Sequence, residues 1–287
     1  MMERKSSDRM PALTTLPSFR SDTKSEPIQR WKDGFRRFNL HGTIVELGTA
    51  DDLNELIVEY GILPPDRYDA LGTRFRRYAR ALYFPWSKEF RWLPEPANEH
   101  GEALSPYYQD GHNPEHVGKY RYFPTISDKV RSNPALQLTI FSALSQTVWE
   151  AEDARYPVSV GVHMIAQRVT EERPVATVSP NCMHQDGEVF DYVILIARHG
   201  VTGGKSCIAP VSTVGRMVDA MDLEPGTCQF TLQHPLEGFG VRDEFIAHGV
   251  SEVRLAPGFS EGYRYTLLVD TAPMREWHRP SWELRKS

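Results

Sequence analysis

Cysteine and long apolar runs are both scarce in this sequence. Its 287 residues include three cysteines, Cys182, Cys207 and Cys228, which show no C-x-x-C spacing and cannot all pair with one another. Few cysteines without a disulfide pattern indicate a reducing compartment, so we expect a cytoplasmic protein. No apolar run approaches the roughly 20 residues that a membrane-spanning helix requires, so we expect no such helix.

Basic residues do not outnumber acidic ones, and the sequence has no internal repeat. The 33 Lys and Arg are dispersed among 38 Asp and Glu, which gives a formal net charge of −5. Without a basic stripe, nucleic-acid, lipid and protein substrates are disfavoured, and a small-molecule substrate is favoured. Residues 1–28 mix charge, Ser and Pro without the apolar segment of a secretory signal, so we expect a flexible leader there.

The remaining composition is ordinary for a globular protein, with 40% hydrophobic and 25% charged residues, and the length suits one large domain. Helical signals lie in the first half. A helix is expected over residues 51–61, capped by Thr49, because Leu53, Leu56 and Tyr60 recur at helical spacing. A second is expected over residues 134–149, with Asn133 as its cap and proline at its first position.

From residue 157 onwards, short alternating or apolar segments predict strands. These segments are 158–162, 189–197, 227–232, 245–255 and 263–271. Their near-regular spacing without intervening helices favours a β-sandwich or barrel. Residues 72–83 are ambiguous between helix and strand, and we expect an edge strand there.

The chain contains one H-x-D sequence, His184-Gln185-Asp186. Residues two apart on an extended strand point to the same side, so this imidazole and this carboxylate could bind one metal ion. Alone, such a pair often arises by chance and is more often structural. The turn-like residues 179–181, the strand predicted at 189–197 and the adjacent Gly187 favour a ligand pair at a strand entrance.

A second imidazole is expected from His248, which apolar strand residues flank on both sides. The alternative is a structural core or loop histidine. His199 precedes Gly200 and His234 precedes Pro235, so both competing histidines look like loop residues. Two imidazoles and one carboxylate on one face of Fe(II) leave the opposite positions open for a co-substrate and dioxygen.

A cation follows in the last predicted strand. Arg264 and Thr266 share one face of that strand, and an arginine in an apolar strand is costly without an anion to pair with. A guanidinium with a neighbouring hydroxyl suits a carboxylate. The alternative is an inter-strand salt bridge to Asp243 or Asp270.

Taken in order, these features resemble the Fe(II)/2-oxoglutarate-dependent dioxygenases. Within that superfamily the pattern is most similar to the bacterial branch that contains the free L-isoleucine 4-hydroxylase, including an Arg-rich block at residues 74–78. The resemblance covers about residues 60–272. The motifs that carry it are His184-x-Asp186-Gly187, Gly203-Gly204, Ala247-His248-Gly249-Val250 and Arg264-x-Thr266.

The resemblance implies a mainly β protein with flanking helices and a double-stranded β-helix, or jelly-roll, core. It implies one domain over residues 29–287, with a helical N-terminal part to about 155, the jelly-roll core at about 156–272 and a C-terminal tail at 273–287. His184, Asp186 and His248 would bind Fe(II), and Arg264, assisted by Thr266, would hold the 5-carboxylate of 2-oxoglutarate. The implied reaction uses O2, releases succinate and CO2, and hydroxylates an unactivated C–H bond of a free L-amino acid or close derivative.

The sequence identifies substrate-binding residues less specifically than metal ligands. The carboxylate of an amino acid requires a cation, and each of five candidates also has a solvated or structural alternative: Arg76, Arg77, Arg121, Arg168 and Arg242. Residues 120–123 place a cation among aromatic rings, which would form a pocket wall or a packed strand. Cys182 would point the same way as His184, and we interpret it as a packing residue.

Other chemistries at the same site stay open. Desaturation and cyclisation begin with the same hydrogen abstraction as hydroxylation, and a carrier-bound amino acid is an alternative substrate. Halogenation is disfavoured, because a chloride ligand usually needs the position that Asp186 takes. A non-enzymatic cupin-like binding protein would be expected to have more closely spaced histidines and no distal arginine. The sequence specifies neither the attacked carbon nor an oligomeric state.

Overall fold

The computed structural model describes residues 14–15, 34–46, 50–95, 97–109, 118–147, 149–178, 180–221 and 225–275. Most of the expected leader, the expected cap Thr49 and the tail from residue 276 lie outside these residues. Within the expected leader, Thr14–Thr15 forms a short strand, β1, that pairs with β4. In the described part of the chain, no helix is long and apolar enough to cross a membrane.

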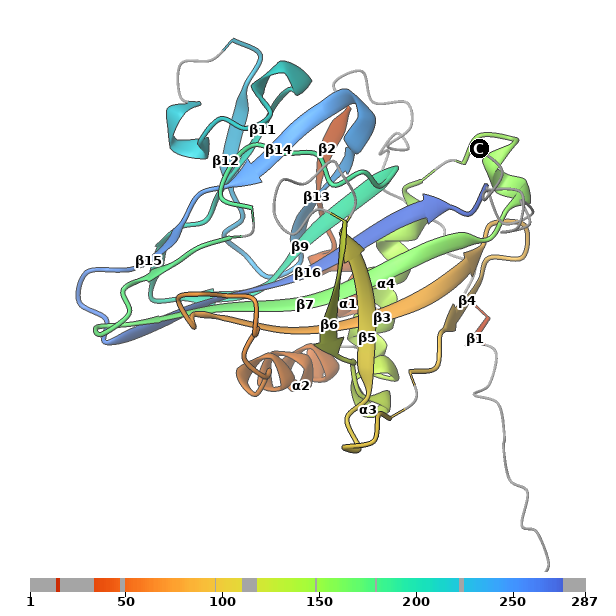
Figure 1. Ribbon diagram of the computed structural model, residues 1–287, viewed down its shortest axis with the longest axis horizontal. Coiled ribbons are helices and arrows are strands. Elements are labelled where there is room, and N and C mark those ends of the chain that lie inside the picture. The colour runs from red at the N-terminus through yellow and green to blue at the C-terminus, as the bar shows by residue number, and fades with distance from the viewer. Residues whose placement is uncertain are drawn as a thin grey trace, which may run out of the picture.

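Eight antiparallel strands form the main sheet (Figure 1). In spatial order they are β1 (Thr14–Thr15), β4 (Glu89–Trp92), β3 (Arg74–Phe84), β7 (Val158–Thr170), β16 (Glu261–Pro273), β9 (Phe190–His199), β13 (Glu237–Arg242) and β2 (Phe35–Asn39). The longest pairing joins β7 to β16 along their whole lengths. This long central pair carries residues of both the core and the cavity described below.

Three smaller sheets complete the β structure. A minor sheet has the order β12 (Cys228–Thr231), β11 (Lys205–Pro210) and β14 (Ile246–Val250), and another has the order β10 (Val201–Gly203), β15 (Val253–Leu255) and β8 (Val175–Ala176). The strands β5 (Leu104–Gln109) and β6 (Lys119–Pro124) pair as a hairpin. In Figure 1 the minor sheet lies above the main sheet, and α2 lies below it. The expectation of a mainly β, jelly-roll fold is confirmed.

Helices cover one face of the main sheet. They are α1 (His41–Glu46), α2 (Ala50–Gly61), α3 (Asp128–Arg131) and α4 (Pro134–Ser145). Short 3-10 turns lie elsewhere in the described chain, at Asp153–Arg155, Val211–Thr213, Val218–Ala220 and Asp243–Phe245. The predicted cap is confirmed, because the Asn133 side chain accepts a hydrogen bond from the Leu136 N–H at 3.0 Å. The helix ends at Ser145 rather than near Trp149. At its end the Gln146 N–H donates a hydrogen bond to the Ala143 carbonyl.

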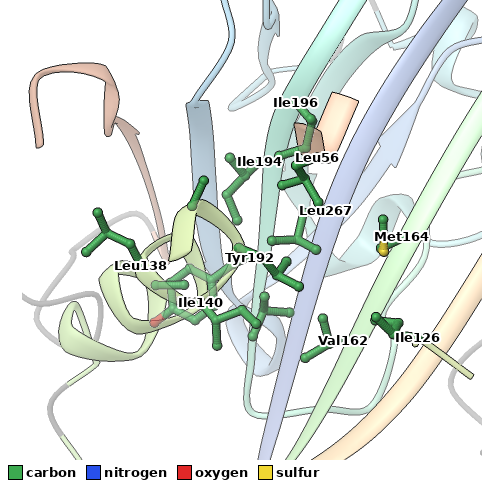
Figure 2. Close-up of a cluster of buried hydrophobic side chains, with 14 of the residues drawn as sticks. Leu56, Ile126, Leu138, Ile140, Val162, Met164, Tyr192, Ile194, Ile196 and Leu267 are labelled. Atoms are coloured by element: carbon green, nitrogen blue, oxygen red, sulfur yellow. The ribbon is translucent and has the colours of Figure 1, made fainter. Parts of the chain in front are cut away.

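The helix-facing side of the main sheet is apolar. Successive residues of a strand point to opposite faces, so Leu267 of β16 and Val162 of β7 share this side. They pack with Leu56 of α2 and Ile140 of α4 in one buried cluster (Figure 2). Each of these four side chains is almost fully buried. Because side chains alternate between the two faces, the residues between these apolar ones point to the other side of the sheet, towards the cavity.

Residues 72–83 form a strand as expected, but not an edge strand. Their strand, β3, lies between β4 and β7. Even charged residues of this strand are buried: Arg74 is 4% exposed, and its Nε lies 2.7 Å from Asp66 Oδ2. The N-terminal part, expected to be helical to about residue 155, thus also supplies strands β2 to β6.

Residues 245–255 form two strands rather than the expected one. β14 belongs to the minor sheet, and β15 pairs with β10 and β8. Between them the Ser251 N–H donates to the Lys205 carbonyl, and the Glu252 carbonyl accepts from the Gly204 N–H, each at 2.9 Å. These bonds to a distant segment turn the chain from one sheet to the next.

Candidate active site

His184, Asp186 and His248 come together in the wall of a cavity that residues of the main sheet also line. The backbones of His184 and His248 exchange hydrogen bonds at 2.9 Å in each direction, which places the two imidazoles side by side. Asp186 Oδ2 lies 3.1 Å from His248 Nε2, and Asp186 Oδ1 lies 3.6 Å from His184 Nε2. One ligand atom from each side chain lies within 4.8 Å of the others.

A polar group lies behind each imidazole. His184 Nδ1 donates to the Cys182 carbonyl at 2.9 Å, which leaves Nε2 facing the cluster. Behind the other ring, Asp243 Oδ1 lies 3.5 Å from His248 Nδ1, and Asp243 Oδ2 accepts from the Gly187 N–H at 2.8 Å. Asp243 was considered from sequence only as a partner for Arg264. Its actual place is behind a histidine of the cluster.

The charges of the cluster shift its pKa values. Burial disfavours the imidazolium of His248, but the hydrogen bond and negative charge of Asp186, with the charge of Asp243, outweigh it, so the pKa of His248 is raised. Burial raises the pKa of Asp243 to about 6 against the opposing charge of His248. A cation bound between His184 and His248 would also contact the carboxylate of Asp186, which faces both imidazoles.

Arg264 lines the same cavity and is 3% exposed. Its Nη1 donates to Gln167 Oε1 at 3.2 Å, whereas its Nε and Nη2 find no hydrogen-bond partner in the described part of the chain. The salt bridges to Asp243 or Asp270 considered as alternatives are absent among the described residues: Asp243 faces His248, and Asp270 bonds to His163. Burial, with the nearby charge of Arg198, lowers the pKa of Arg264 to about 10.

A glycine makes room for this guanidinium arm. Gly204 has φ of +62°, and a Cβ at this position would lie 2.9 Å from Arg264 Cδ. A side chain at residue 204 would therefore strain the backbone and displace the arginine. The Gly203-Gly204 motif thus lies against Arg264, the candidate co-substrate residue.

These groups fit the cofactors of an iron oxygenase. Two imidazole nitrogens and one carboxylate form the facial donor set that binds Fe(II) and leaves positions open. The two unpaired N–H donors of buried Arg264 fit a carboxylate, and Thr266, on the same strand face, is 1% exposed and lines the cavity. Two observations support this fit: Arg264 is buried with two nitrogen atoms that bond to no described residue, and His184, Asp186 and His248 supply the donor atoms that Fe(II) prefers.

The five candidate substrate arginines separate into two groups. Arg76 and Arg121 line the cavity. The other three point elsewhere: Arg77 donates to the Thr125 carbonyl, Arg168 donates to the Tyr60 carbonyl, and Arg242 lies against Glu244. The competing histidines His199 and His234 do not line this cavity.

Several residues of the cavity were not predicted from the sequence to belong to the site. His163 and Gln167 of β7, Tyr107 of β5 and Asp270 of β16 line the cavity with the residues above. His163 and Gln167 are four residues apart in β7 and share one face of that strand, and this spacing could have marked them. Tyr107 has no such mark, because its place depends on how the hairpin lies over the main sheet.

A sequence model of the family described as "2OG-Fe dioxygenase" matches residues 59–270, well over half of the chain. The chain belongs to this family. It is accordingly a 2-oxoglutarate-dependent dioxygenase, and enzymes of the family use Fe(II), 2-oxoglutarate and O2. No curated protein matches the sequence.

Solved structures of similar fold include other dioxygenases. IDO from Bacillus thuringiensis is 19% identical with a TM-score of 0.65, over 87% of this chain and 94% of its own. A bsmA homologue from Methylobium petroleophilum PM1 is 19% identical with a TM-score of 0.64, over 86% and 92% of the two chains. The Fe(II)/(alpha)ketoglutarate-dependent dioxygenase TqaL is 15% identical with a TM-score of 0.61, over 87% and 86%. At these identities the likeness establishes the fold.

Proposed function

We propose that this dioxygenase hydroxylates an unactivated C–H bond of a free L-amino acid or close derivative. In this proposal His184, Asp186 and His248 hold Fe(II), and Arg264 with Thr266 binds the 5-carboxylate of 2-oxoglutarate. One O2 and one 2-oxoglutarate are consumed in each turnover. One oxygen atom enters succinate, the other becomes the hydroxyl group of the product, and CO2 leaves.

The observation that carries the proposal is one cavity lined both by the cluster of His184, Asp186 and His248 and by buried Arg264, which forms no ion pair with any residue that the structure describes. When bound, Fe(II) supplies the activation of O2 that is coupled to the decarboxylation of 2-oxoglutarate. The role of the protein is to orient both substrates and to exclude water. The buried positions of His184, His248 and Arg264 suit that role.

The charges of the cavity wall support an amino acid as the substrate. Arg76 and Arg121 provide positive charge, and Asp270 and Asp191 provide carboxyl groups in the same cavity. A zwitterion needs groups of both kinds. The motifs shared with the branch that contains the free L-isoleucine 4-hydroxylase favour the same class.

The proposal is tested by measuring succinate release with Fe(II), 2-oxoglutarate and ascorbate against each standard L-amino acid, followed by the product mass. We expect at least one amino acid to stimulate succinate release and to gain one oxygen atom. A product that has instead lost two hydrogen atoms would assign desaturation or cyclisation. No amino-acid-dependent release would overturn the proposed substrate class.

A further inference from the structure

Asp191 is a buried carboxyl group in the wall of the cavity. It lies on β9, is 7% exposed and lines the same cavity as the metal-ligand cluster. Its Oδ2 has no hydrogen-bond partner, and no residue that the structure describes forms an ion pair with it. Burying a carboxyl group without a partner is costly, so we expect either a proton or a bound ligand at this position.

A second carboxylate lies next to Asp191 on the neighbouring strand. Asp191 and Asp270 are opposite residues of the antiparallel strands β9 and β16, and both line the cavity. Opposite residues of this kind have Cβ atoms about 5 Å apart. Asp270 turns towards β7, because its Oδ2 lies 2.6 Å from His163 Nε2 and its carboxylate lies over Gly161, where a Cβ would collide with it. Asp191 is therefore the carboxyl group of the two that is left without a partner.

The charges around Asp191 are negative. Burial, followed by the charges of Asp186, Asp243 and Glu188, raises the pKa of Asp191. A cationic group against this carboxyl group would lower the same pKa, because an opposite charge favours the ionised form. Without a ligand the carboxyl group therefore holds a proton, and a cationic group would take the place of that proton.

The charged side chains of the cavity wall leave an excess of one negative charge when all carboxyl groups are ionised. Four arginines and four acidic residues line the cavity: Arg74, Arg76, Arg121, Arg264, Asp186, Glu188, Asp191 and Asp270. Arg74 is already paired with Asp66, at 2.7 Å. Behind the wall, the opposite charges of Asp243 and Arg198 cancel, as do those of Fe(II) and the dianion 2-oxoglutarate. A zwitterion would leave the excess unchanged, whereas an amino acid with a cationic side chain would neutralise it.

The position of Asp191 suits the side chain of an amino acid better than its α-ammonium group. The guanidinium of Arg76 lies over β7, because its Nη2 is hydrogen-bonded to His163 Nδ1. An amino acid with its carboxylate against Arg76 would have its α-ammonium group close by, on the side of Asp270. Asp191 lies two strands beyond β7, a distance of about 10 Å. This distance is comparable with the length of an extended lysine or arginine.

Apolar side chains flank Asp191 on its face of the sheet. Val193 lies two residues along β9, Val241 is the opposite residue on β13, and both line the cavity. Lysine and arginine side chains combine an apolar stem with a charged end. The stem would pack against the two valines while the charged end reaches Asp191.

We infer that Asp191 is a subsite for a cationic side chain, so that the primary substrate is a basic amino acid with a terminal ammonium or guanidinium group. This inference rests on the proposed function and narrows its substrate class. The ionised carboxylate of Asp191 would accept charge-assisted hydrogen bonds from the terminal group. A neutral side chain of the same length would give up that charge and the strength of those bonds.

The first test compares matched pairs of amino acids on the wild-type protein. L-lysine is paired with 6-hydroxy-L-norleucine and L-arginine with L-citrulline, which keep the side-chain length but lose the charge. Binding is measured by anaerobic titration calorimetry with Fe(II) and 2-oxoglutarate bound. We expect the cationic member of at least one pair to bind roughly 10- to 100-fold more tightly, the value of a hydrogen bond to a charged group. Binding equal to within about threefold in both pairs would overturn the subsite.

The second test replaces Asp191 by asparagine, which keeps the shape and removes the charge. Asp191→Asn should raise the dissociation constant of the preferred basic amino acid by roughly 10- to 100-fold and leave that of its neutral counterpart within about threefold. The dissociation constants of 2-oxoglutarate and of Fe(II), the latter from competition with a chelator, should stay unchanged. Glu261→Gln is the control, because it removes one negative charge at the exposed start of β16, outside the cavity. Equal affinity of the two variants for the basic amino acid would overturn the subsite.

The outcomes separate this inference from the proposed function. If a neutral amino acid is hydroxylated and the basic ones neither bind nor react, the subsite is wrong and the proposed function stands. If Asp191→Asn weakens Fe(II) binding but keeps the preference for the cationic member of each pair, Asp191 serves the metal site and the subsite is wrong. If no amino acid binds or stimulates succinate release, the substrate class fails and the subsite fails with it. The comparison of matched pairs on the wild-type protein does not depend on whether the variant folds.

Discussion

The two faces of the main sheet use the same strands for opposite purposes. On the helix side, Tyr265, Leu267 and Val269 of β16 pack into the apolar cluster beneath α2 and α4. On the cavity side, Arg264 and Asp270 are charged and line the cavity together with Thr266 and Leu268. Both faces carry apolar residues, but these two charged side chains lie only on the cavity side. Alternation along one strand thus separates residues that stabilise the fold from residues that bind ligands.

The two faces of the main sheet also differ in how burial affects the stability of the protein. Burying Leu267 or Val162 removes apolar area from water and stabilises the folded chain. Burying Arg264 or Arg76 costs desolvation that no ion pair in the described part of the chain offsets. Substitutions on the helix side should therefore lower stability, and those on the cavity side should lower binding or turnover. The predictions below test this separation, from the largest expected effect to the smallest.

His184→Ala removes one candidate metal ligand on the cavity side. Loss of a ligand that supports several kcal/mol of charge stabilisation should lower succinate formation by a factor on the order of 10³ or more. The free energy of unfolding of the metal-free protein should change by less than about 1 kcal/mol. His199→Ala is the control, since His199 lies at the end of β9 outside the cavity. Equal activity in the two variants would rule out the assignment.

Leu267→Ala creates a void on the helix side. The side chain is fully buried, so the free energy of unfolding should fall by about 2–5 kcal/mol. Chemical denaturation measures the loss. The apparent affinity for 2-oxoglutarate of the folded protein should not change, because the side chain points away from the cavity. A weaker affinity for 2-oxoglutarate would show that the two faces are coupled.

His163→Phe removes a buried titrating group from the cavity side. The folded-state pKa of His163 is about 4, below the ordinary value of 6.5, so only the unfolded chain takes up this proton between those pH values. Wild-type stability therefore falls as pH drops from 6.5 to 4, and this residue accounts for about 3 kcal/mol of the fall. Urea unfolding at several pH values should show a shallower acid slope for the variant. Identical slopes would contradict the buried, neutral imidazole.

Arg264→Leu tests the co-substrate residue. Removing charged hydrogen bonds to the 5-carboxylate should weaken 2-oxoglutarate binding by roughly 10- to 100-fold. The stability of the ligand-free protein should not fall, because the substitution removes a buried charge that forms no ion pair with the described residues. Titration of 2-oxoglutarate into the Fe(II) protein measures the first effect, and denaturation measures the second. An unchanged affinity for 2-oxoglutarate would make the arginine structural.

Asp243→Asn tests the group behind His248. The amide keeps the shape but loses the charge that faces His248 Nδ1, so metal affinity should fall by about 10- to 100-fold. Competition with a chelator gives the metal dissociation constant without relying on turnover. Glu244→Gln, the next residue along the chain, is the control because Glu244 pairs with Arg242 instead. Equal metal affinity in both variants would remove Asp243 from the site.

Features set by neighbouring residues were predictable from the sequence. The cap at Asn133 and the strand that carries Arg264 and Thr266 follow from local patterns, and the structure has both. The grouping of His184, Asp186 and His248 was also expected, although it joins a loop to a distant strand. This grouping could be predicted because only a few residue types bind metal ions, and the chain has few histidines and carboxylates in suitable positions.

Features set by distant pairings were not predictable. The position of β3 inside the sheet depends on β4 and β7, and the break after Val250 depends on bonds to Lys205 and Gly204. The selection of Arg76 and Arg121 from five arginines depends on how the β5–β6 hairpin lies over the main sheet. Alternation of side chains says which face a residue occupies, but not what covers that face.

The β5–β6 hairpin hydrogen-bonds as a sheet of its own, apart from the other strands that the structure describes. It carries Tyr107 and Arg121 into the cavity, whereas Arg264 sits on a strand fixed by partners on both sides. Exchanging the hairpin would leave the register of every other sheet intact. If the substrate contacts Tyr107 and Arg121, a change confined to this hairpin should alter the choice of substrate without altering the strands that carry His248 and Arg264.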